Sequence, residues 1–211
     1  MSDLALGNLI ELKRRLLPAT LLTQTTYDET ITAIGRGVAG LMDKKCNRKF
    51  ARSTAAQDQF SADRLSYVVE RFPVESITTI EIRDNIDAGW VTQDSSLILN
   101  RDDAAGLIHF GTIIASHLAQ VRLTYSGGYW YDTAETEDTA LPSGATRVPY
   151  DVKEAWYLQC ESVWQVRDKL GTNILSAGGG GGALLGMSLP GLDLIPMVKQ
   201  ILGGHQRFQM T

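Results

Sequence analysis

The sequence predicts an α+β fold, in which a helical bundle of three main helices carries an inserted small antiparallel β-sheet. An extended Gly-rich C-terminal tail follows and ends in a short helix. Two observations lead to this fold class. The spacing of apolar residues changes from helical to alternating near residue 57 and returns to helical near residue 149. A run of five glycines, Gly178 to Gly182, then precedes an apolar stretch, which is typical of a flexible linker beside a short docking element.

Three segments have helical periodicity, at residues 4–17, 27–46 and 149–170. In the first, Leu9, Leu12 and Leu16 share one face, and Pro18 ends the helix. Pro149 suits the first turn of the third helix. The apolar faces of the second and third helices contain Ile31, Ile34, Val38, Leu41 and Met42, and Val152, Ala155, Trp156, Gln159, Cys160 and Val163, respectively.

Three glycines inside the second helix are unusual, because each costs about 1 kcal/mol relative to alanine. They are Gly35, Gly37 and Gly40. Close packing against a neighbouring helix would explain them, and a kink in the helix is the alternative.

The segment from about residue 57 to 126 alternates apolar and polar side chains and is predicted to form the sheet. The expected strands are "SYVVE" (66–70), "TTIEIRD" (78–84), "SSLILN" (95–100), "GLIHF" (106–110) and "AQVRLTYS" (119–126). Turn residues separate these strands, among them Pro73, Asp87 with Gly89, and Asp102 with Asp103.

Residues 127–148 are predicted to form a loop, and loops of this length usually have a function. The loop combines aromatic residues with carboxylates, namely Tyr129, Trp130, Tyr131, Asp132, Glu135, Glu137 and Asp138. We expect it to face a partner protein or a neighbouring subunit. The aromatic residues could instead cover the edge of the core, or stack on a sugar.

The predicted body ends at residue 170, and residues 171–211 form the Gly-rich tail. Within it, residues 193–202 are expected to be a helix, with Asp193 as N-cap, Pro196 in the first turn and Gly203 after the end. Burying the apolar side chains of this helix roughly balances the entropy cost of ordering it, so the helix needs a surface to lie on. The predicted docking residues are Leu194, Ile195, Met197, Val198, Ile201 and Leu202.

Composition and motifs exclude several functions. The formal net charge of −4 argues against a general nucleic-acid binder. The two cysteines, Cys46 and Cys160, form no disulfide framework, and the N-terminus lacks the apolar core of a signal peptide. The charge-free stretch at 171–192 is too rich in glycine to be a membrane span.

No pattern indicates catalysis, a cofactor or a metal, so we expect the protein not to be an enzyme. Asp102, Asp103, His109 and His117 lack the spacing of metal ligands and suit ordinary turn chemistry. The glycine run lacks the Gly-Lys-Ser/Thr ending of a phosphate-binding loop.

Five short segments, in this order and spacing, resemble the head-tail connector (adaptor) proteins of tailed bacteriophages and related prophage particles. They are "CNRKF" (46–50), "RFPVESITTI" (71–80), "VRLTYSGGY" (121–129), "VPYDVKEAW" (148–156) and "LIPMVKQIL" (194–202). The resemblance implies a homo-oligomeric ring, typically of twelve copies, assembled in the host cytoplasm and located in the virion neck beneath the portal protein.

By the same resemblance, the ring joins the head to a tail or stopper protein and extends the channel for viral DNA, which passes without specific binding. The terminal helix would then dock on the portal or on an adjacent subunit, with no membrane involved. Two alternatives remain open from the residues. One is a carbohydrate-binding or enzymatic tail module that uses the aromatic loop, and the other is a membrane-active particle component that uses the Gly-rich tail.

Overall fold

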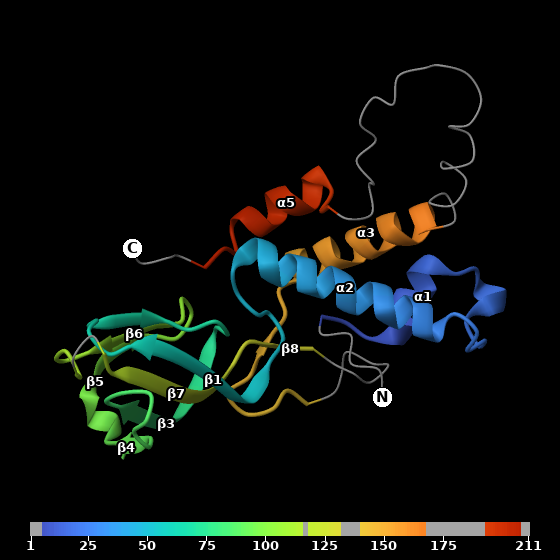
Figure 1. Ribbon diagram of the computed structural model, residues 1–211. Helices are drawn as coiled ribbons and strands as arrows, with labels where there is room; N and C mark the ends of the chain where they lie inside the picture. The colour runs from blue at the N-terminus through green and yellow to red at the C-terminus, as the bar shows by residue number, and fades with distance from the viewer. Residues whose placement is uncertain (1–5, 116–117, 132–139, 168–192, 208–211) are drawn as a thin grey trace. The chain divides into compact units, whose positions relative to one another are not determined.

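The computed structural model describes residues 6–115, 118–131, 140–167 and 193–207, and these have the predicted α+β fold (Figure 1). The chain divides into two compact units. The helical unit contains Met1–Cys46, Tyr131–Thr139 and Val148–His205, and the β unit contains Asn47–Trp130, Ala140–Arg147 and Gln206–Thr211. Among the described residues, no helix is both long enough and apolar enough to cross a membrane.

The helical unit contains four α-helices in its described part. They are α1 (Leu9–Leu16), α2 (Asp28–Cys46), α3 (Tyr150–Arg167) and α5 (Pro196–Gly203), with a short 3-10 turn, η1 (Ala19–Leu21), after α1. The bounds of α2 and α3 lie within a residue of those predicted, except that residues 168–170 fall outside the described part. The first helix is shorter than the predicted 4–17.

The start of α1 is fixed by Asn8 rather than by the apolar stripe. The Asn8 side-chain oxygen accepts a hydrogen bond of 2.7 Å from the Glu11 backbone N–H, which satisfies one of the free amides at the helix start. Leu6 and Gly7 lie in a bend before this cap. The prediction that the helix begins at Leu4 is therefore wrong for residues 6–8, whereas residues 4 and 5 lie outside the described part.

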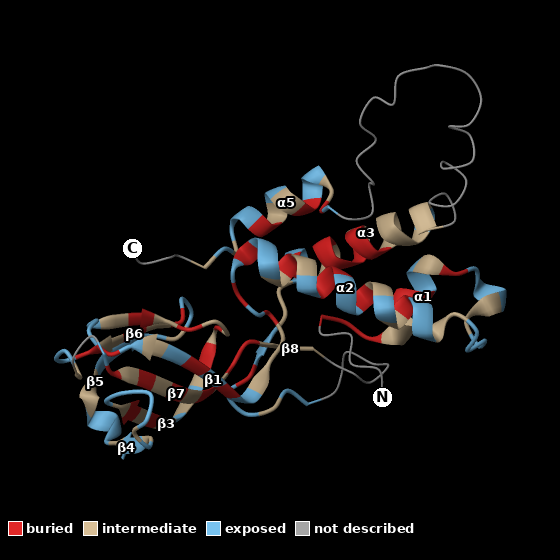
Figure 2. Ribbon diagram, in the orientation of Figure 1, coloured by how far each residue is buried: buried red, intermediate tan, exposed pale blue. Residues whose placement is uncertain are grey.

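Trp156 of α3 is the largest fully buried side chain of the helical unit. Its indole N–H donates a hydrogen bond of 2.9 Å to the carbonyl of Gly35 in α2. A Cβ atom at Gly7 would lie only 2.6 Å from the indole, so glycine is required there by contact. Gly35 is thus buried at the contact between α2 and α3, and Figure 2 shows the buried residues along both helices.

Gly37 and Gly40, in contrast, lie on the exposed side of α2, where an added Cβ would meet no atom within 4 Å. We expect the double substitution Gly37→Ala/Gly40→Ala to raise the free energy of unfolding by about 1–2 kcal/mol, because alanine restricts the unfolded chain and favours the helix. Urea unfolding of the isolated protein checks this. The matched variant Gly7→Ala should destabilise the protein, and a loss of stability in the double variant would contradict the expectation.

The β unit contains two antiparallel sheets instead of the single small sheet predicted. Four strands, in the order β1-β7-β3-β4, form one sheet: β1 (Ser53–Ser61), β7 (Gln120–Gly127), β3 (Val74–Arg83) and β4 (Val91–Gln93). Three strands, in the order β2-β6-β5, form the other: β2 (Ser66–Val68), β6 (Leu107–Phe110) and β5 (Ile98–Asp102). A short 3-10 turn, η2 (Ser95–Leu97), precedes β5.

The predicted loop at 127–148 also contains paired strands. In this segment β8 (Tyr129–Trp130) pairs in parallel with β9 (Thr146–Arg147). A left-handed backbone at Gly128, with φ of 94°, lets the chain turn from β7 into β8 beside the carbonyl of Ala51. The aromatic start of the loop is therefore tied into the β unit.

A buried polar pair, Asp58 and Tyr125, lies in the core of the β unit. One Asp58 oxygen accepts hydrogen bonds from the Tyr125 hydroxyl at 2.9 Å and from the Glu70 backbone N–H at 2.6 Å. Burial raises the pKa of Asp58, and these two hydrogen bonds only partly offset it. The nearby charge of Glu70 raises this pKa further, and that of Arg207 lowers it.

This raised pKa predicts a pH dependence with a defined sign. The folded protein binds the Asp58 proton more tightly than the unfolded chain, so this group stabilises the fold at low pH and loses that contribution as the pH rises through the folded pKa. Between pH 7 and 4, wild type should therefore gain stability relative to the isosteric variant Asp58→Asn. Asp94→Asn should show the opposite sign at lower pH: hydrogen bonds from Ser96 lower the pKa of Asp94, so wild type loses this contribution only as the pH falls below about 4. Parallel pH series of urea unfolding test both signs.

Candidate docking surfaces

The segment after the glycine run packs against the other helices of its own unit. Helix α5 contacts α3 and α2, and three of its predicted docking residues are buried there: Leu194 with 5% exposed, and Val198 and Leu202 with none. Sequence reasoning placed residues 193–202 outside the body, whereas in the structure they belong to the helical unit. The surface that this helix needs is present within the chain, on α2 and α3.

Gln159 fixes the start of α5 on α3. Its fully buried side-chain amide donates to the Asp193 carbonyl at 3.1 Å and accepts from the Ile195 backbone N–H at 2.9 Å. Both polar atoms of one amide are thus satisfied by backbone groups on the two sides of Leu194. The sequence did contain a signal for this contact, because Gln159 is the one amide in the apolar face of α3.

The other end of α5 is held by two further contacts. His205 lies 2.7 Å from the carboxylate of Asp151 at the start of α3, and the Cys46 thiol at the end of α2 donates to the Leu202 carbonyl at 3.7 Å. Burial raises the pKa of Asp151, but the hydrogen bonds from His205 and from the Val152 amide outweigh it and hold the pKa below its ordinary value. Since residue 193 lies at Gln159 and residue 205 at Asp151, α5 runs antiparallel to α3.

The remaining predicted docking residues lie away from this groove. Met197 is 59% exposed, and Ile195 and Ile201 are half-buried. Lys199 forms an ion pair with Asp193, which is exposed. The structure therefore divides the six predicted residues into an inner set, Leu194, Val198 and Leu202, and an outer set, Ile195, Met197 and Ile201.

The aromatic residues of the predicted partner-facing loop are partly engaged within the β unit. Tyr129 stacks on Phe50 with ring centroids 6.4 Å apart, and the guanidinium of Arg147 lies 5.2 Å from the centroid of Trp130. Tyr131 is half-buried and belongs to the helical unit. Tyr129 and Trp130 thus cover the core edge in part, while Asp132, Glu135, Glu137 and Asp138 lie outside the described residues.

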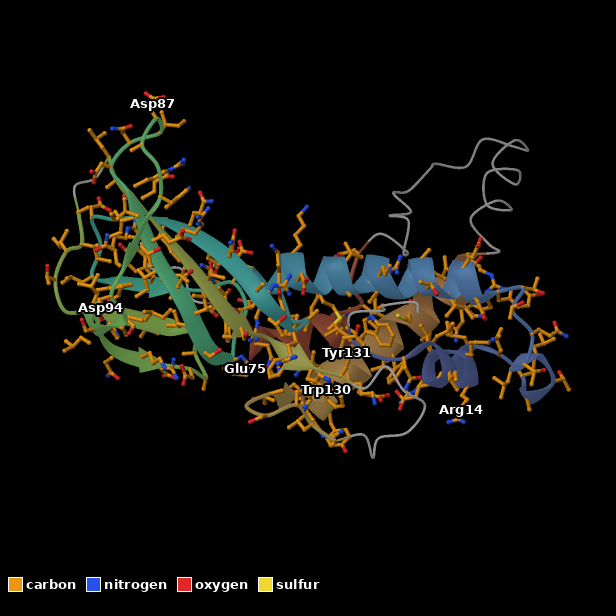
Figure 3. All side chains as sticks on the ribbon, turned by 90° about the horizontal axis from the view of Figure 1, so that it is seen from below. Arg14, Glu75, Asp87, Asp94, Trp130 and Tyr131 are labelled. Atoms are coloured by element: carbon orange, nitrogen blue, oxygen red, sulfur yellow. The ribbon has the colours of Figure 1, made fainter. Side chains whose placement is uncertain are left out.

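One end of the β unit exposes aliphatic side chains that sequence reasoning did not single out. Ser61 of β1 and Arg83 of β3 both pair with Gln120 of β7, so these three residues lie side by side at the same end of the sheet. Figure 3 shows Asp87 and Asp94 at one end of the unit and Glu75 and Trp130 at the other. The segments next to the paired Ser61, Arg83 and Gln120 carry Leu65, Ile86, Ile113 and Leu118, which are 50%, 81%, 56% and 69% exposed.

A charged network joins α1 to α3 beside an open pocket of the helical unit. Arg15 binds both carboxylate oxygens of Glu154, at 2.8 and 2.6 Å, and its guanidinium lies 4.3 Å from the centroid of the Tyr157 ring. Glu11 accepts a hydrogen bond from the Tyr157 hydroxyl and pairs with Lys153 at 3.0 Å. Burial, and then the bond to Glu11, raises the pKa of Tyr157. The pairing of these charges indicates a structural role.

The polar residues considered for metal or acid–base chemistry are not gathered into a site. Asp102 accepts hydrogen bonds from the Ala104 and Ala105 amides, which is turn chemistry, and His109 pairs with Ser66 at 2.6 Å. His117 lies outside the described residues. Within the described ranges, no group of three or more His, Cys, Asp or Glu side chains is placed to hold a metal ion.

Both cysteines are buried, and burial raises the pKa of the Cys160 thiol, which makes it a poor nucleophile.

No family model matches this chain, and no curated protein sequence matches it. Solved structures that share its fold include two chains of gene transfer agent (GTA) particles. A chain in the neck of an empty GTA particle, computed with C6 symmetry, has a TM-score of 0.59 and 13% identity, over 96% of this chain and 90% of that one. A chain in the virion of a native GTA particle has a TM-score of 0.57 and 11% identity, with the same coverage. This protein thus has, over nearly its whole length, a fold found in the neck of a GTA particle.

Proposed function

We propose that this protein is a structural, non-enzymatic component of the neck of a phage-like particle, where it acts as a head-tail adaptor. The observation that carries the proposal is the shared fold with a chain of a GTA particle neck, over 96% of this chain. The connector-like segments of the sequence support the same role independently. The acidic net charge of −4 suits a protein that lets DNA pass without holding its phosphates.

In this role the protein forms a ring that adjoins the portal protein on one side and a tail or stopper protein on the other. We propose twelve copies, the number that the family resemblance implies. Twelve is compatible with the sixfold symmetry of the GTA neck. Native mass spectrometry of the purified protein, alone and with portal protein, tests both the ring and its stoichiometry.

A particle made without this protein tests the function directly. We expect filled heads that lack tails, and we expect added purified protein to restore the joining of heads to tails in vitro. Normal tailed particles in the absence of the protein would refute the adaptor role. Electron microscopy of the wild-type particle should place the protein at the head-tail junction.

Two surfaces are proposed to face the neighbours in the neck. The outer set on α5, Ile195, Met197 and Ile201, would contact the portal or an adjacent subunit, because the inner set is already buried. The acidic segment after Tyr131 would face the tail or stopper protein or a neighbouring subunit. Carboxylates on such a rim steer association and specify the partner.

We therefore expect neutralisation of the acidic segment to weaken joining without unfolding the protein. The variant carries Asp132→Asn, Glu135→Gln, Glu137→Gln and Asp138→Asn, and its joining rate should fall and become less dependent on salt. The control replaces the same number of exposed carboxylates elsewhere, at Asp63, Asp84, Asp87 and Asp94. Equal joining rates for wild type and the loop variant would show that the segment is only a spacer.

A further inference from the structure

The chain between α3 and α5 is much longer than the packing of these helices requires. Residue 193 lies at Gln159, and α3 continues for eight residues beyond Gln159 to Arg167. At 1.5 Å per residue, this separates the two ends by about 12 Å along α3. Packed antiparallel helices are usually joined by about 2–8 residues, whereas 25 residues lie between Arg167 and Asp193.

The length of this connection suits a larger span. A Gly-rich chain of 25 residues has a root-mean-square end-to-end distance of about 25–30 Å. For a given span, the effective concentration of a tethered group is highest when the root-mean-square length of the linker matches that span. A compact unit of roughly 100 residues has a radius of gyration of about 13 Å, so two such units in contact have centres roughly 30 Å apart. The length of the connection therefore suits the span to a neighbouring unit, whereas the span of about 12 Å within its own unit is best served by a much shorter connection.

The groove that receives α5 can accept this helix from any copy. Its polar contacts with α5 come from the buried amide of Gln159, the Asp151 carboxylate and the Cys46 thiol. Because all copies have the same sequence, α5 of another copy can make the same contacts. Exchange between copies would therefore keep every contact and would add a covalent connection between subunits.

We propose that, in the assembled ring, α5 of each subunit occupies the α2–α3 groove of the adjacent subunit. This inference rests on the proposed ring-forming function and names the partner of its C-terminal helix as a second copy of this chain. Each subunit then contributes its inner set, Leu194, Val198 and Leu202, to the core of its neighbour. In the unassembled monomer, the dispersed chain, α5 occupies the groove of its own helical unit.

A cross-link across the groove distinguishes the two arrangements. In the full-length chain, Asp151→Cys and His205→Cys place two accessible thiols on opposite sides of the contact, while Cys46 and Cys160 are fully buried. A short bismaleimide is added to dispersed chain and to assembled rings, and the products are separated under denaturing conditions. We expect intrachain cross-linking in the dispersed chain and a ladder of covalent multimers in the rings. Each single-cysteine variant should give no ladder.

The connection supplies a second test. Deletion of residues 172–186 leaves ten residues, which still cover the gap within one chain but have a root-mean-square span of only about 16–19 Å. This deletion should lower the yield of the ladder, whereas replacing the same residues with fifteen of Gly and Ser should preserve it. Rings with the expected native mass that give only monomeric products would overturn helix exchange alone. Absence of any ring by native mass would overturn the adaptor proposal and the exchange with it.

Discussion

Replacing Trp156 with alanine is expected to lower the free energy of unfolding of the helical unit by about 3–5 kcal/mol. The side chain is fully buried at the contact between α2 and α3, where it also fills the space beside Gly7. Truncation would leave a cavity and would remove the donor for the carbonyl of Gly35, a buried residue of α2. Urea unfolding followed by circular dichroism in the helical range gives the measurement.

Trp164 supplies the matched control on the same helix. It is half-buried and makes an edge contact with Tyr27, at a centroid distance of 5.8 Å. Trp164→Ala should therefore cost clearly less than Trp156→Ala. Trp156→Phe separates the contribution of packing from that of the hydrogen bond to Gly35, because it keeps much of the side-chain volume and removes the hydrogen bond. Equal losses for the Trp156 and Trp164 alanine variants would show that the contact with Gly35 and Gly7 does not organise the unit.

Replacing Leu202 with alanine is expected to cost about 2–5 kcal/mol, although this residue follows a predicted linker near the end of the chain. Leu202 is fully buried between α5 and its groove, whereas Met197 on the same helix is 59% exposed. Met197→Ala should change the stability by no more than about 0.5 kcal/mol. The two variants remove similar apolar volumes from one helix, so their difference isolates burial in the groove.

The effects of these two variants on the joining of heads to tails should differ in another way from their effects on stability. Met197→Ala should fold normally and still impair the joining of heads to tails, because Met197 belongs to the outer set. Leu202→Ala should impair joining only as far as it detaches α5. A Leu202→Ala variant with wild-type stability would show that α5 does not contribute to the fold of the helical unit in solution.

The helices were predictable because their apolar spacing is intact in the sequence, and only a local cap shortened α1. The strands that the sequence missed carry weak signals. In β1, "STAAQDQFS" contains only one aromatic and one β-branched residue, and its pairing with β7, between residues 59 to 74 positions apart, decides its structure. Likewise β4, of three residues, is defined by its partner β3. Long-range pairing of this kind leaves little trace in a local window.

The need of residues 194–202 to bury apolar side chains was predictable from the sequence, but the surface that buries them was not. The sequence indicates that residues 194–202 must bury apolar side chains, yet periodicity does not say against which molecule. The deciding residue, Gln159, is 34 positions from Asp193, and its role follows only from the two backbone hydrogen bonds. The exposed aliphatic side chains at Leu65, Ile86, Ile113 and Leu118 likewise become a set only when the strand register brings their segments to one end.

The C-terminal residues have a consequence for how such a protein can be recombined. Residues 47–130 and 140–147 contribute almost the whole β unit, which suggests that the segment 47–147 could be exchanged between related chains as one piece, together with Tyr131–Thr139 of the helical unit. However, Gln206–Thr211 also belong to the β unit, and Arg207 donates a hydrogen bond to the Val68 carbonyl. A transplanted cassette must therefore inherit a matching C-terminal hexapeptide, so that viable chimaeras require two crossovers within the gene and a third near its end.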